Sequence, residues 1–356
     1  RLCSKGSALH ETVSLKGRLL YPEIGGERVE WEEALGAVAG GFEKVIDEHG
    51  PEAVAFYVSG QLLTEDYYVA NKLMKGYIGS ANIDTNSRLC MSSAVVGYKR
   101  AFGADAVPNC YEDFDHANLM VLVGSNTAWC HPIVYQRIVK AKKNNPNMKV
   151  VVVDPRRTAT SDIADLQLQI KAGSDVALFN GLLCHIAASN GQNRDYTSRY
   201  TLGYGDALSV AREQGGDIEQ VAFQCGVSDH DLLTFYDWFV QTPETVTLFS
   251  QGVNQSTQGS DKVNSIINCH LATGSLGKPG AGPFSITGQP NAMGGREVGG
   301  LSTTLAAHMD IANESHRNVV QTFWESPTIC DKPGYKAVDL FEAIEAGKVK
   351  AVWVMA

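Results

Sequence analysis

The sequence predicts an α/β protein with doubly wound, mostly parallel sheets in more than one lobe. Short apolar runs alternate with longer stretches of helical period, which is the rhythm of strand–helix–strand units. The strand-like runs are apolar throughout, as expected for strands that are buried on both faces. The 356 residues are enough for two compact lobes, each with its own core.

The first half of the chain supplies the clearest elements. A helix is expected over 31–50, a strand over 53–60, and a second helix with Thr64 as N-cap and a stop near Gly79. Strands over 118–126 and 148–157 follow, with a helix between them that carries Pro132 in its first turn. A short strand, "LQLQI", and a helix capped by Ser174 or Asp175 come next.

The second half is less regular. Residues 190–240 indicate mostly helical, polar structure, an insertion or a link between subdomains. "ETVTLFSQG" returns to a strand, and residues 274–300 form a long glycine-rich loop of the kind that is usually functional. Residues 336–356 predict a final helix and strand.

Composition excludes several classes of protein. A net charge of −9 gives no electrostatic footprint for nucleic acid, and no apolar run approaches the roughly 20 residues of a membrane span. The eight cysteines are scattered without a CxxC pair, which favours a reduced, cytoplasmic compartment over a disulfide framework. Because the chain starts without methionine and stops on an apolar run, we expect a fragment that is truncated at both ends.

Polar turns follow the expected strands. In doubly wound sheets, ligands bind beyond the carboxyl ends of the strands. These ends are Ser59–Gln61, Gly124–Thr127, Asp154–Thr158, Gly173–Asp175 and Gln251–Gln255. Glycines admit phosphates, helix N-termini favour their charge, and arginines pair with them. Each turn alone is an ordinary strand–helix connection, but the five together favour a large nucleotide-bearing ligand. The absence of GxGxxG and Walker A patterns disfavours ordinary NAD or ATP.

The stretch "NSRLCMSS" places Cys90 just before or within the start of an expected helix. The residue is either core packing or a thiolate that the helix dipole stabilises. Such a thiolate is a nucleophile or a ligand for a soft metal. A cysteine hydrolase that pairs Cys90 with His131 or His116 is the alternative, but the sequence carries no local nucleophile signature for it.

Seven segments together resemble one family, and they span essentially the whole chain. They are "RLCSKGSALHE", "NSRLCMSSAVVGYKRAFG", "VLVGSNTAWCHP", "VVVDPRRTATSDIAD", "KAGSDVALFNGLL", "SQGVNQSTQG" and "TGQPNAMGGREVGG". The chain resembles the prokaryotic molybdopterin oxidoreductases and, within them, the assimilatory nitrate reductase catalytic subunits. The implied architecture is that of the family, with α/β lobes around a bis-pterin funnel.

The resemblance implies a molybdenum atom held by two molybdopterin guanine dinucleotides, and one [4Fe-4S] cluster. Cys90 falls at the molybdenum ligand, and Met91 follows it as in nitrate reductases. Cys3 falls at the last of the four cluster cysteines, the other three lying upstream of Arg1. Lys5 matches a lysine between cluster and pterin, with a solvated surface lysine as the alternative.

The resemblance also implies the remaining site residues. The cofactor-binding set is Lys5, Gln61, Asn86, Cys90, Gly124, Ser125, Asn126, Thr127, Asp154, Pro155, Arg156, Arg157, Thr158, Gly173, Ser174, Asp175, Gln251 and Gln255. Gln289 and Arg296 match the glycine-rich loop near molybdenum. A guanidinium suits nitrate, a planar anion, whereas an ion pair with Glu297 is the structural alternative for Arg296.

The implied activity is the two-electron reduction of nitrate to nitrite by oxygen-atom transfer, in nitrate assimilation. Electrons would come from a flavoprotein, ferredoxin or flavodoxin. The alternatives are a periplasmic-type nitrate reductase, a formate dehydrogenase and a non-catalytic scaffold relative. Formate dehydrogenases carry histidine after the metal ligand, where this chain has Met91. A scaffold relative need not keep the metal cysteine or the strand-end turns.

The resemblance suggests four segments. Residues 1–50 hold the end of the iron–sulfur region and the first helix, and 51–150 hold a first, discontinuous α/β lobe with Cys90. Residues 151–250 form a dinucleotide-binding lobe, and 251–356 return to the first lobe with the glycine-rich loop. A C-terminal pterin-binding domain is expected outside the chain.

Overall fold

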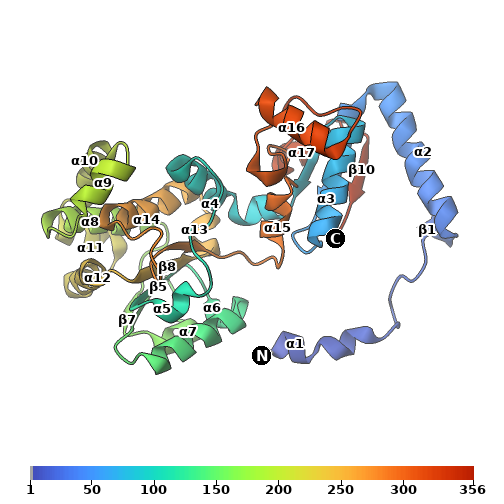
Figure 1. The fold of residues 1–356 in the computed structure, drawn as a ribbon. Helices are drawn as coiled ribbons and strands as arrows, with labels where there is room; N and C mark the ends of the chain where they lie inside the picture. The colour runs from blue at the N-terminus through green and yellow to red at the C-terminus, as the bar shows by residue number, and fades with distance from the viewer. Residues whose placement is uncertain (1–2) are drawn as a thin grey trace. The chain divides into compact units, whose positions relative to one another are not determined.

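The computed structural model describes residues 3–356 and divides into two compact units. One unit is Cys90–Gly288, and the other joins the residues up to Leu89 with Gln289–Ala356. Figure 1 labels the elements of both. This division differs from the expected boundaries after residues 50, 150 and 250. The boundary after 150 cuts a strand whose hydrogen-bonded neighbours lie on either side of it in sequence.

A five-stranded, fully parallel sheet forms the centre of Cys90–Gly288. In chain order, its strands are β5 (Leu119–Val123), β6 (Lys149–Val153), β7 (Leu166–Leu168), β8 (Thr245–Phe249) and β9 (Gly282–Ser285). Their spatial order is β7-β6-β5-β8-β9. The chain therefore winds outward from β5 to β7 and then returns to the opposite side of β5. The switch in direction lies between β5 and β8.

Both faces of this sheet are buried because side chains alternate along each strand. Leu119, Val121 and Val123 of β5 join one apolar cluster, and Met120 and Leu122 join a second cluster on the opposite face. The predicted apolar runs are thus confirmed as strands with two buried faces. The helices of this unit that flank the sheet are α5 (Asp113–His116), α6 (Thr127–Cys130), α7 (Pro132–Asn144), η4 (Ala159–Ile163), α8 (Asp175–Ala188), α13 (Gln251–Asn254) and α14 (Gly259–Thr273).

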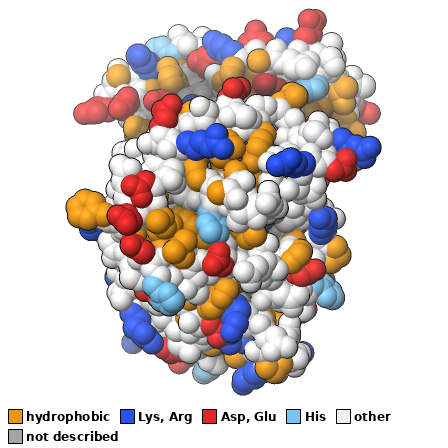
Figure 2. Space-filling model, turned by 90° about the vertical axis from the view of Figure 1, so that its left-hand side faces the viewer, with side chains coloured by type: hydrophobic (Ala, Val, Ile, Leu, Met, Phe, Trp, Pro, Cys, Tyr) orange, Lys and Arg blue, Asp and Glu red, His pale blue; other side chains and the backbone are white. Residues whose placement is uncertain are grey.

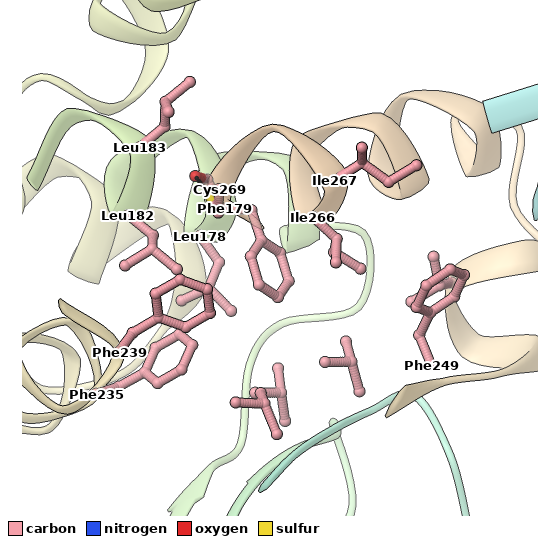
Figure 3. Close-up of a cluster of buried hydrophobic side chains, with 14 of the residues drawn as sticks. Leu178, Phe179, Leu182, Leu183, Phe235, Phe239, Phe249, Ile266, Ile267 and Cys269 are labelled. Carbon is pink, nitrogen blue, oxygen red and sulfur yellow. Dashed lines mark hydrogen bonds between the residues drawn. The ribbon is translucent and has the colours of Figure 1, made fainter. Parts of the chain in front are cut away.

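The segment predicted as helical and polar is helical but contributes part of the core. It forms α9 (Arg194–Tyr200), α10 (Tyr204–Gly215), α11 (Ile218–Cys225) and α12 (Asp229–Gln241). Figure 3 shows Phe235 and Phe239 beside side chains of α8 and α14. The hydroxyl of Tyr236 donates to the Leu178 carbonyl at 2.6 Å. The prediction of a mostly polar insertion is wrong because the apolar face of α12 covers α8.

The second unit is built on a three-stranded parallel sheet in the order β10-β3-β4. These strands are β3 (Val54–Val58), β4 (Ile83–Thr85) and β10 (Ala351–Val354). Trp353 of β10 lies opposite Phe56 of β3, and their rings meet edge-on at 5.6 Å. This pairing joins β10, the last strand of the chain, to β3. The final helix and strand predicted from the sequence are present at Ala337–Glu345 and Ala351–Val354.

Helices and short elements complete this unit. They are α1 (Ser4–Ser7), η1 (Leu9–Val13), β1 (Glu23–Ile24), β2 (Glu27–Arg28), α2 (Trp31–His49), η2 (Pro51–Ala53), α3 (Thr64–Lys72), η3 (Leu73–Ile78), α15 (Ala292–Glu297), η5 (Ala306–His308), α16 (Glu314–Trp324) and α17 (Ala337–Glu345). One further helix, α4 (Ser87–Phe102), crosses from this unit into Cys90–Gly288. Among residues 3–356, no helix combines the length and apolar character needed to cross a membrane.

Two local predictions are wrong. Leu63, rather than Thr64, is the N-cap of α3, and the Asp66 carboxylate accepts its backbone N–H at 3.2 Å. Asp66 therefore caps the start of α3 by accepting the Leu63 N–H, whereas the sequence predicted a cap from Thr64. The glycine-rich segment 274–300 is not one loop, because it contains β9 and α15. Pairing with β8 turns Gly282–Ser285 into a strand despite its glycine and proline.

Surface charge agrees with the composition. Figure 2 shows basic and acidic side chains interspersed over the face that it displays. On that face, the basic side chains do not gather into a patch large enough to attract a polyanion or an anionic membrane.

A buried lysine fixes part of the second unit. Lys75, in the π-helical turn η3, is fully buried and donates to three backbone carbonyls. These belong to Gly299, Leu301 and Thr304, at 2.6, 2.7 and 2.6 Å. An ammonium group has three donors, and all three are used on one segment. Burial lowers the pKa of Lys75 to about 7, so the charged form that makes all three bonds is favoured below neutral pH.

Replacing Lys75 should therefore destabilise the protein. Lys75→Met leaves three buried carbonyls without their donor, and we expect a loss of at least about 3 kcal/mol. Chemical denaturation at pH 6, where the ammonium is charged, measures the loss. Lys44→Met on the exposed face of α2 is the matched control and should cost less than about 0.5 kcal/mol. Equal stability of the two variants would contradict a role for the ammonium in holding this segment.

A buried histidine has a similar bridging role in the first unit. His270 of α14 is fully buried, and its Nδ1 and Nε2 lie 2.8 Å from Ser275 Oγ and Thr247 Oγ1. A neutral imidazole donates at one nitrogen and accepts at the other, so it satisfies both hydroxyls. Burial lowers the pKa of His270 from 6.5 to about 3.

This shift predicts a pH dependence of stability. Between pH 6.5 and 3, the unfolded chain binds a proton at His270 that the folded chain does not. Stability therefore falls with falling pH, by up to about 1.4 kcal/mol per pH unit from this group. His270→Asn should remove that part of the slope, whereas His230→Asn on the surface should keep it. Unfolding free energies between pH 6.5 and 4.5 measure the difference, and identical slopes in both variants would refute it.

Candidate functional site

A cavity lies at the carboxyl edge of the five-stranded sheet. Its volume is about 880 Å³, within the roughly 300–1,000 Å³ range of ligand pockets. The turns after β5, β6, β7 and β8 all contribute to its wall. Of the expected cofactor-binding set, those lining it are Gly124, Ser125, Asn126, Asp154, Pro155, Arg156, Gly173, Asp175, Gln251 and Gln255. Parallel pairing thus brings together turns from four separate parts of the chain.

Two glycines meet at the switch point of the sheet. Gly124 has a φ of +52°, and a Cβ there would lie 2.8 Å from the Cα of Gly252. The backbone N–H of Gly252 donates to the Gly124 carbonyl at 3.0 Å. Any side chain at either position would force the β5 and β8 turns apart. The cavity therefore has bare backbone in its wall, as a phosphate-bearing ligand requires.

The turn after β6 is shaped by its aspartate. The Asp154 carboxylate accepts the backbone N–H of Arg156 at 2.8 Å, which closes a tight Asx turn. Arg156 is exposed and lines the cavity. The turn thus presents a guanidinium at the rim of the cavity.

Eight residues of the expected cofactor-binding set do not line this cavity, and four of these belong to the strand-end turns of Cys90–Gly288. Thr127 is fully buried, and its hydroxyl lies 2.8 Å from that of Ser125. Arg157 is exposed, and Thr158 caps η4 by accepting from Thr160 N–H at 3.3 Å. Ser174 is the N-cap residue of α8, as one of the two sequence alternatives predicted, but its hydroxyl donates to the Lys171 carbonyl.

Sequence reasoning missed several cavity residues. They are Cys130, Val153, Ile170, Ala172, Ser250, Ser256, Lys262 and Gly288, whereas Gly252 lies in an expected turn and His131 was named only in the hydrolase alternative. Lys262 is the least expected, because its side chain is only 4% exposed. Its position four residues before Ile266 puts it in line with the apolar side of α14. A lysine in register with an apolar stripe is the signal that could have found it.

Cys90 is buried, with 8% of its surface exposed. It is the fourth residue of α4 and directly precedes a break in that helix at Met91, where φ is −139° and ψ is 25°. The N–H of Ala94, just beyond the break, donates to the Asn254 side chain at 2.8 Å. This contact ties α4 to α13, which lies near it in Figure 1. The break leaves Cys90 immediately before a helical segment, close to where the sequence predicted it.

The sulfur of Cys90 receives a hydrogen bond. Gln251 Nε2 lies 2.7 Å from Cys90 Sγ, and Thr287 Oγ1 lies 3.7 Å from it. Ser250 Oγ bonds to the Gln251 Oε1 atom, which orients the amide so that its N–H group faces the sulfur. A donor aimed at sulfur stabilises negative charge on it. The Nε2 atom of His131 lies 2.6 Å from the carbonyl oxygen of Thr287, the residue whose hydroxyl is near the sulfur.

In the second unit, three expected site residues surround one glycine. Asn86 Oδ1 accepts the N–H of Gly60 at 2.9 Å, and a Cβ on Gly60 would lie 2.6 Å from the Cβ of Gln289. Gln61 follows in the same turn, and its Oε1 atom bonds to the Ser59 hydroxyl. These contacts gather Gln61, Asn86 and Gln289 at the carboxyl ends of β3 and β4.

Arg296 lies on α15 and is only 4% exposed. Its Nη1 lies 3.2 Å from the sulfur of Met293. The adjacent Glu297 carboxylate pairs with His308 at 3.0 Å. The Arg296 guanidinium therefore contacts Met293 of the same helix, and the Glu297 carboxylate pairs with His308.

Cys3 and Lys5 lie at the start of the described chain. Cys3 is the N-cap residue of α1, and Lys5 is exposed on the same short helix. The backbone N–H of Gly6 lowers the pKa of Cys3. A thiol with a lowered pKa more readily becomes the thiolate that metals bind.

Comparison with known proteins agrees with this arrangement. Residues 18–356 match the molybdopterin oxidoreductase family. The chain belongs to that family. It is 58% identical over 355 residues to a nitrate reductase of Klebsiella oxytoca, covering 100% of this chain and 40% of the relative. It is 40% identical over 368 residues to a periplasmic nitrate reductase of Desulfovibrio desulfuricans, covering 99% of this chain and 49% of the relative.

A solved structure supports the fold. Acetylene hydratase from Pelobacter acetylenicus superposes with a TM-score of 0.71 at 18% identity, over 99% of this chain and 55% of that one. The expected α/β architecture with parallel sheets is thereby confirmed. The chain spans about two-fifths to one-half of the length of the two nitrate reductases.

Family membership implies a molybdenum–pterin cofactor, and the residues present fit such a group. The glycine contact between β5 and β8 leaves backbone open to phosphates. The cavity beside it has the size of a nucleotide-bearing ligand. Cys90 offers a buried sulfur with an N–H donor directed at it, which suits a soft-metal ligand.

The Gln251 contact predicts the reactivity of Cys90. Gln251→Leu removes the donor at similar volume, and we expect alkylation of Cys90 by iodoacetamide in cofactor-free protein to slow about 3- to 10-fold. Gln251→Glu should slow it further, because a carboxylate opposes the thiolate. Site-resolved mass spectrometry measures the rates, with Gln241→Leu at the exposed C-terminal end of α12 as control. Unchanged rates in both Gln251 variants would exclude an effect of the amide on the sulfur.

Proposed function

We propose that this chain is part of the catalytic subunit of a molybdenum nitrate reductase that serves nitrate assimilation. Nitrate, two electrons and two protons give nitrite and water by oxygen-atom transfer. The observation that carries the proposal is the buried Cys90 sulfur, which accepts an N–H bond from Gln251. The relatives named nitrate reductases, 58% and 40% identical to this chain, support the choice of substrate.

The cofactor of the proposal is molybdenum with two molybdopterin guanine dinucleotides. Cys90 would be the metal ligand, with Met91 next to it at the break in α4. The strand-end turns of the cavity would hold one dinucleotide. Gln61 and Asn86, which lie in one cluster around Gly60, would also be cofactor contacts. When bound, molybdenum supplies Lewis acidity and the two electrons of the reaction.

The remaining predicted cofactor contacts have supporting roles. Thr127 and Ser125 hold each other, Thr158 caps η4, and Ser174 braces the turn before α8. In the proposal, these three contacts keep the turns in the shape that binds the cofactor. Arg157, which is exposed beside Arg156, adds positive charge for a diphosphate.

Arg296 and Gln289 would bind the substrate. A guanidinium presents several donors in one plane, which suits the planar nitrate anion. Burial of Arg296 to 4% exposure strengthens its attraction for an anion, because water screens it less. In the proposal, these side chains orient nitrate and exclude water around it.

Electron supply completes the proposal. Cys3 would be one ligand of a [4Fe-4S] cluster, and Lys5 would lie on the path from cluster to pterin. The lowered pKa of Cys3, caused mainly by the Gly6 N–H, supports a thiolate there. The donor would be a flavoprotein, a ferredoxin or a flavodoxin, in the cytoplasm.

A periplasmic-type nitrate reductase is the second candidate. The periplasmic relative of Desulfovibrio desulfuricans favours it, since the match covers 99% of this chain. The higher identity to the Klebsiella oxytoca enzyme favours the first candidate. A formate dehydrogenase is disfavoured because Met91 follows Cys90.

Substitution of Cys90 tests the proposal. In the full-length protein, Cys90→Ala should lower nitrate reduction by a reduced dye by more than about 100-fold, because the proposed metal ligand is lost. Cys110→Ala, which removes an exposed thiol, should leave the rate unchanged. Nitrate consumption and nitrite release are measured together, with formate oxidation assayed in parallel.

The outcomes test the proposed metal ligand and the proposed substrate. Full activity of Cys90→Ala would show that another residue holds the metal. Formate oxidation without nitrate reduction by the unsubstituted protein would replace the proposed substrate. If the molybdenum-containing protein shows neither nitrate reduction nor formate oxidation, both the proposed function and the formate dehydrogenase alternative are refuted.

A further inference from the structure

A buried ion pair lies in the wall of the cavity. Lys262 Nζ on α14 and Asp175 Oδ2 at the start of α8 are 2.7 Å apart, with side-chain exposures of 4% and 8%. Both residues line the cavity at the sheet edge. Lys262 Nζ also lies 3.5 Å from the carbonyl of Gly252 at the switch point. The ammonium therefore connects the start of α8 with the turn after β8.

Stability alone does not explain a pair at this place. Two charges withdrawn from water cost several kcal/mol each, and apolar residues of similar volume often do as well or better. The wall around Lys262 is part of the apolar core, since Val263 and Ile266 beside it on α14 are fully buried. An apolar side chain would complete that core. The pair instead places a carboxylate at the surface of a cavity.

The groups around Asp175 make Lys262 its principal partner. Lys262 approaches it from α14, and the Cys225 thiol approaches it from α11. Lys171, in the loop before α8, is exposed and its ammonium donates to the Phe223 carbonyl at 3.0 Å. Burial raises the pKa of Cys225, which keeps that thiol neutral. The charge on Asp175 is thus balanced chiefly from α14.

We propose that Lys262 is a positioning residue that holds the Asp175 carboxylate in the correct orientation for a guanine base. This inference rests on the guanine dinucleotide of the proposed function. Guanine presents an N1–H donor beside a 2-amino donor, and an ionised carboxylate accepts both. Hypoxanthine lacks the 2-amino group, and adenine presents an acceptor at N1, which a carboxylate repels. Selectivity for guanine therefore depends on a carboxylate that keeps both oxygens directed at the base.

Loss of Lys262 has a specific consequence. Asp175 then lies buried without its cation, so its carboxylate rotates toward water. This rotation removes one acceptor from the base while leaving the phosphate-binding turns intact. The loss therefore falls on the preference among bases and much less on binding of the diphosphate.

Nucleotide binding to the full-length, cofactor-free protein tests the inference. Isothermal titration calorimetry with GDP, IDP and ADP gives the three affinities. The unsubstituted protein should prefer GDP to IDP by about 10- to 100-fold, the value of a hydrogen bond to a charged group. Lys262→Met should reduce that ratio to within about threefold while IDP affinity stays the same. Lys262→Arg, which keeps the charge with a different geometry, should give an intermediate ratio.

A matched control separates Lys262 from general charge. Lys171→Met removes a neighbouring lysine that bonds elsewhere, and it should leave the GDP-to-IDP ratio unchanged. Thermal unfolding checks that each variant is folded, and Lys262→Arg carries the test if Lys262→Met is not. An equal loss of affinity for all three nucleotides would overturn the inference and assign Lys262 to the phosphates. An unchanged ratio in Lys262→Met would also overturn it.

Failure of the proposed function can be distinguished from failure of the inference. Equal binding of GDP, IDP and ADP by the unsubstituted protein would refute the inference and the guanine form of the cofactor. Nitrate reduction by the cofactor-loaded protein would still support the activity. Absence of that reduction, with guanine selectivity lost in Lys262→Met, would refute the activity and leave the inference standing.

Discussion

The pairing of β5 with β6 on one side and β8 on the other determines where the polar turns of Cys90–Gly288 lie. Val121 of β5 stands opposite Val151 of β6 and Thr247 of β8. Because all these strands run in one direction, their carboxyl ends meet at one edge. The turns that follow them therefore surround one cavity, and the contact of Gly124 with Gly252 closes it at the switch point.

Buried polar groups fix the segments that regular structure leaves loose. Lys75 holds the chain after α15 through three carbonyls, and His270 joins α14 to β8 and to Ser275. Lys262 and Asp175 do the same for the cavity wall. Each of these groups is costly to bury alone, and its partners offset part of that cost. Such contacts therefore hold a turn in one conformation where a purely apolar contact would allow several.

The cavity and the proposed metal ligand share one residue. The break in α4 places Cys90 beside the turn after β8, so that Gln251 both lines the cavity and donates to the sulfur. One residue thus links the nucleotide-sized cavity to the proposed metal ligand. Membership in the molybdopterin oxidoreductases gives this link its chemical meaning, because the cofactor of that family carries both a metal and a pterin.

The sequence alone determined the central strands, most helices and the strand-end turns, because apolar runs and turn residues act over a few neighbouring positions. Only the tertiary structure decided that Gly282–Ser285 is a strand, since pairing with β8 overrides its local preference. It also decided that Phe235 lies in the core and that Lys262 faces Asp175. The partners in these contacts lie tens of residues apart, and burial of a charge depends on what packs around it rather than on the residues beside it in the chain.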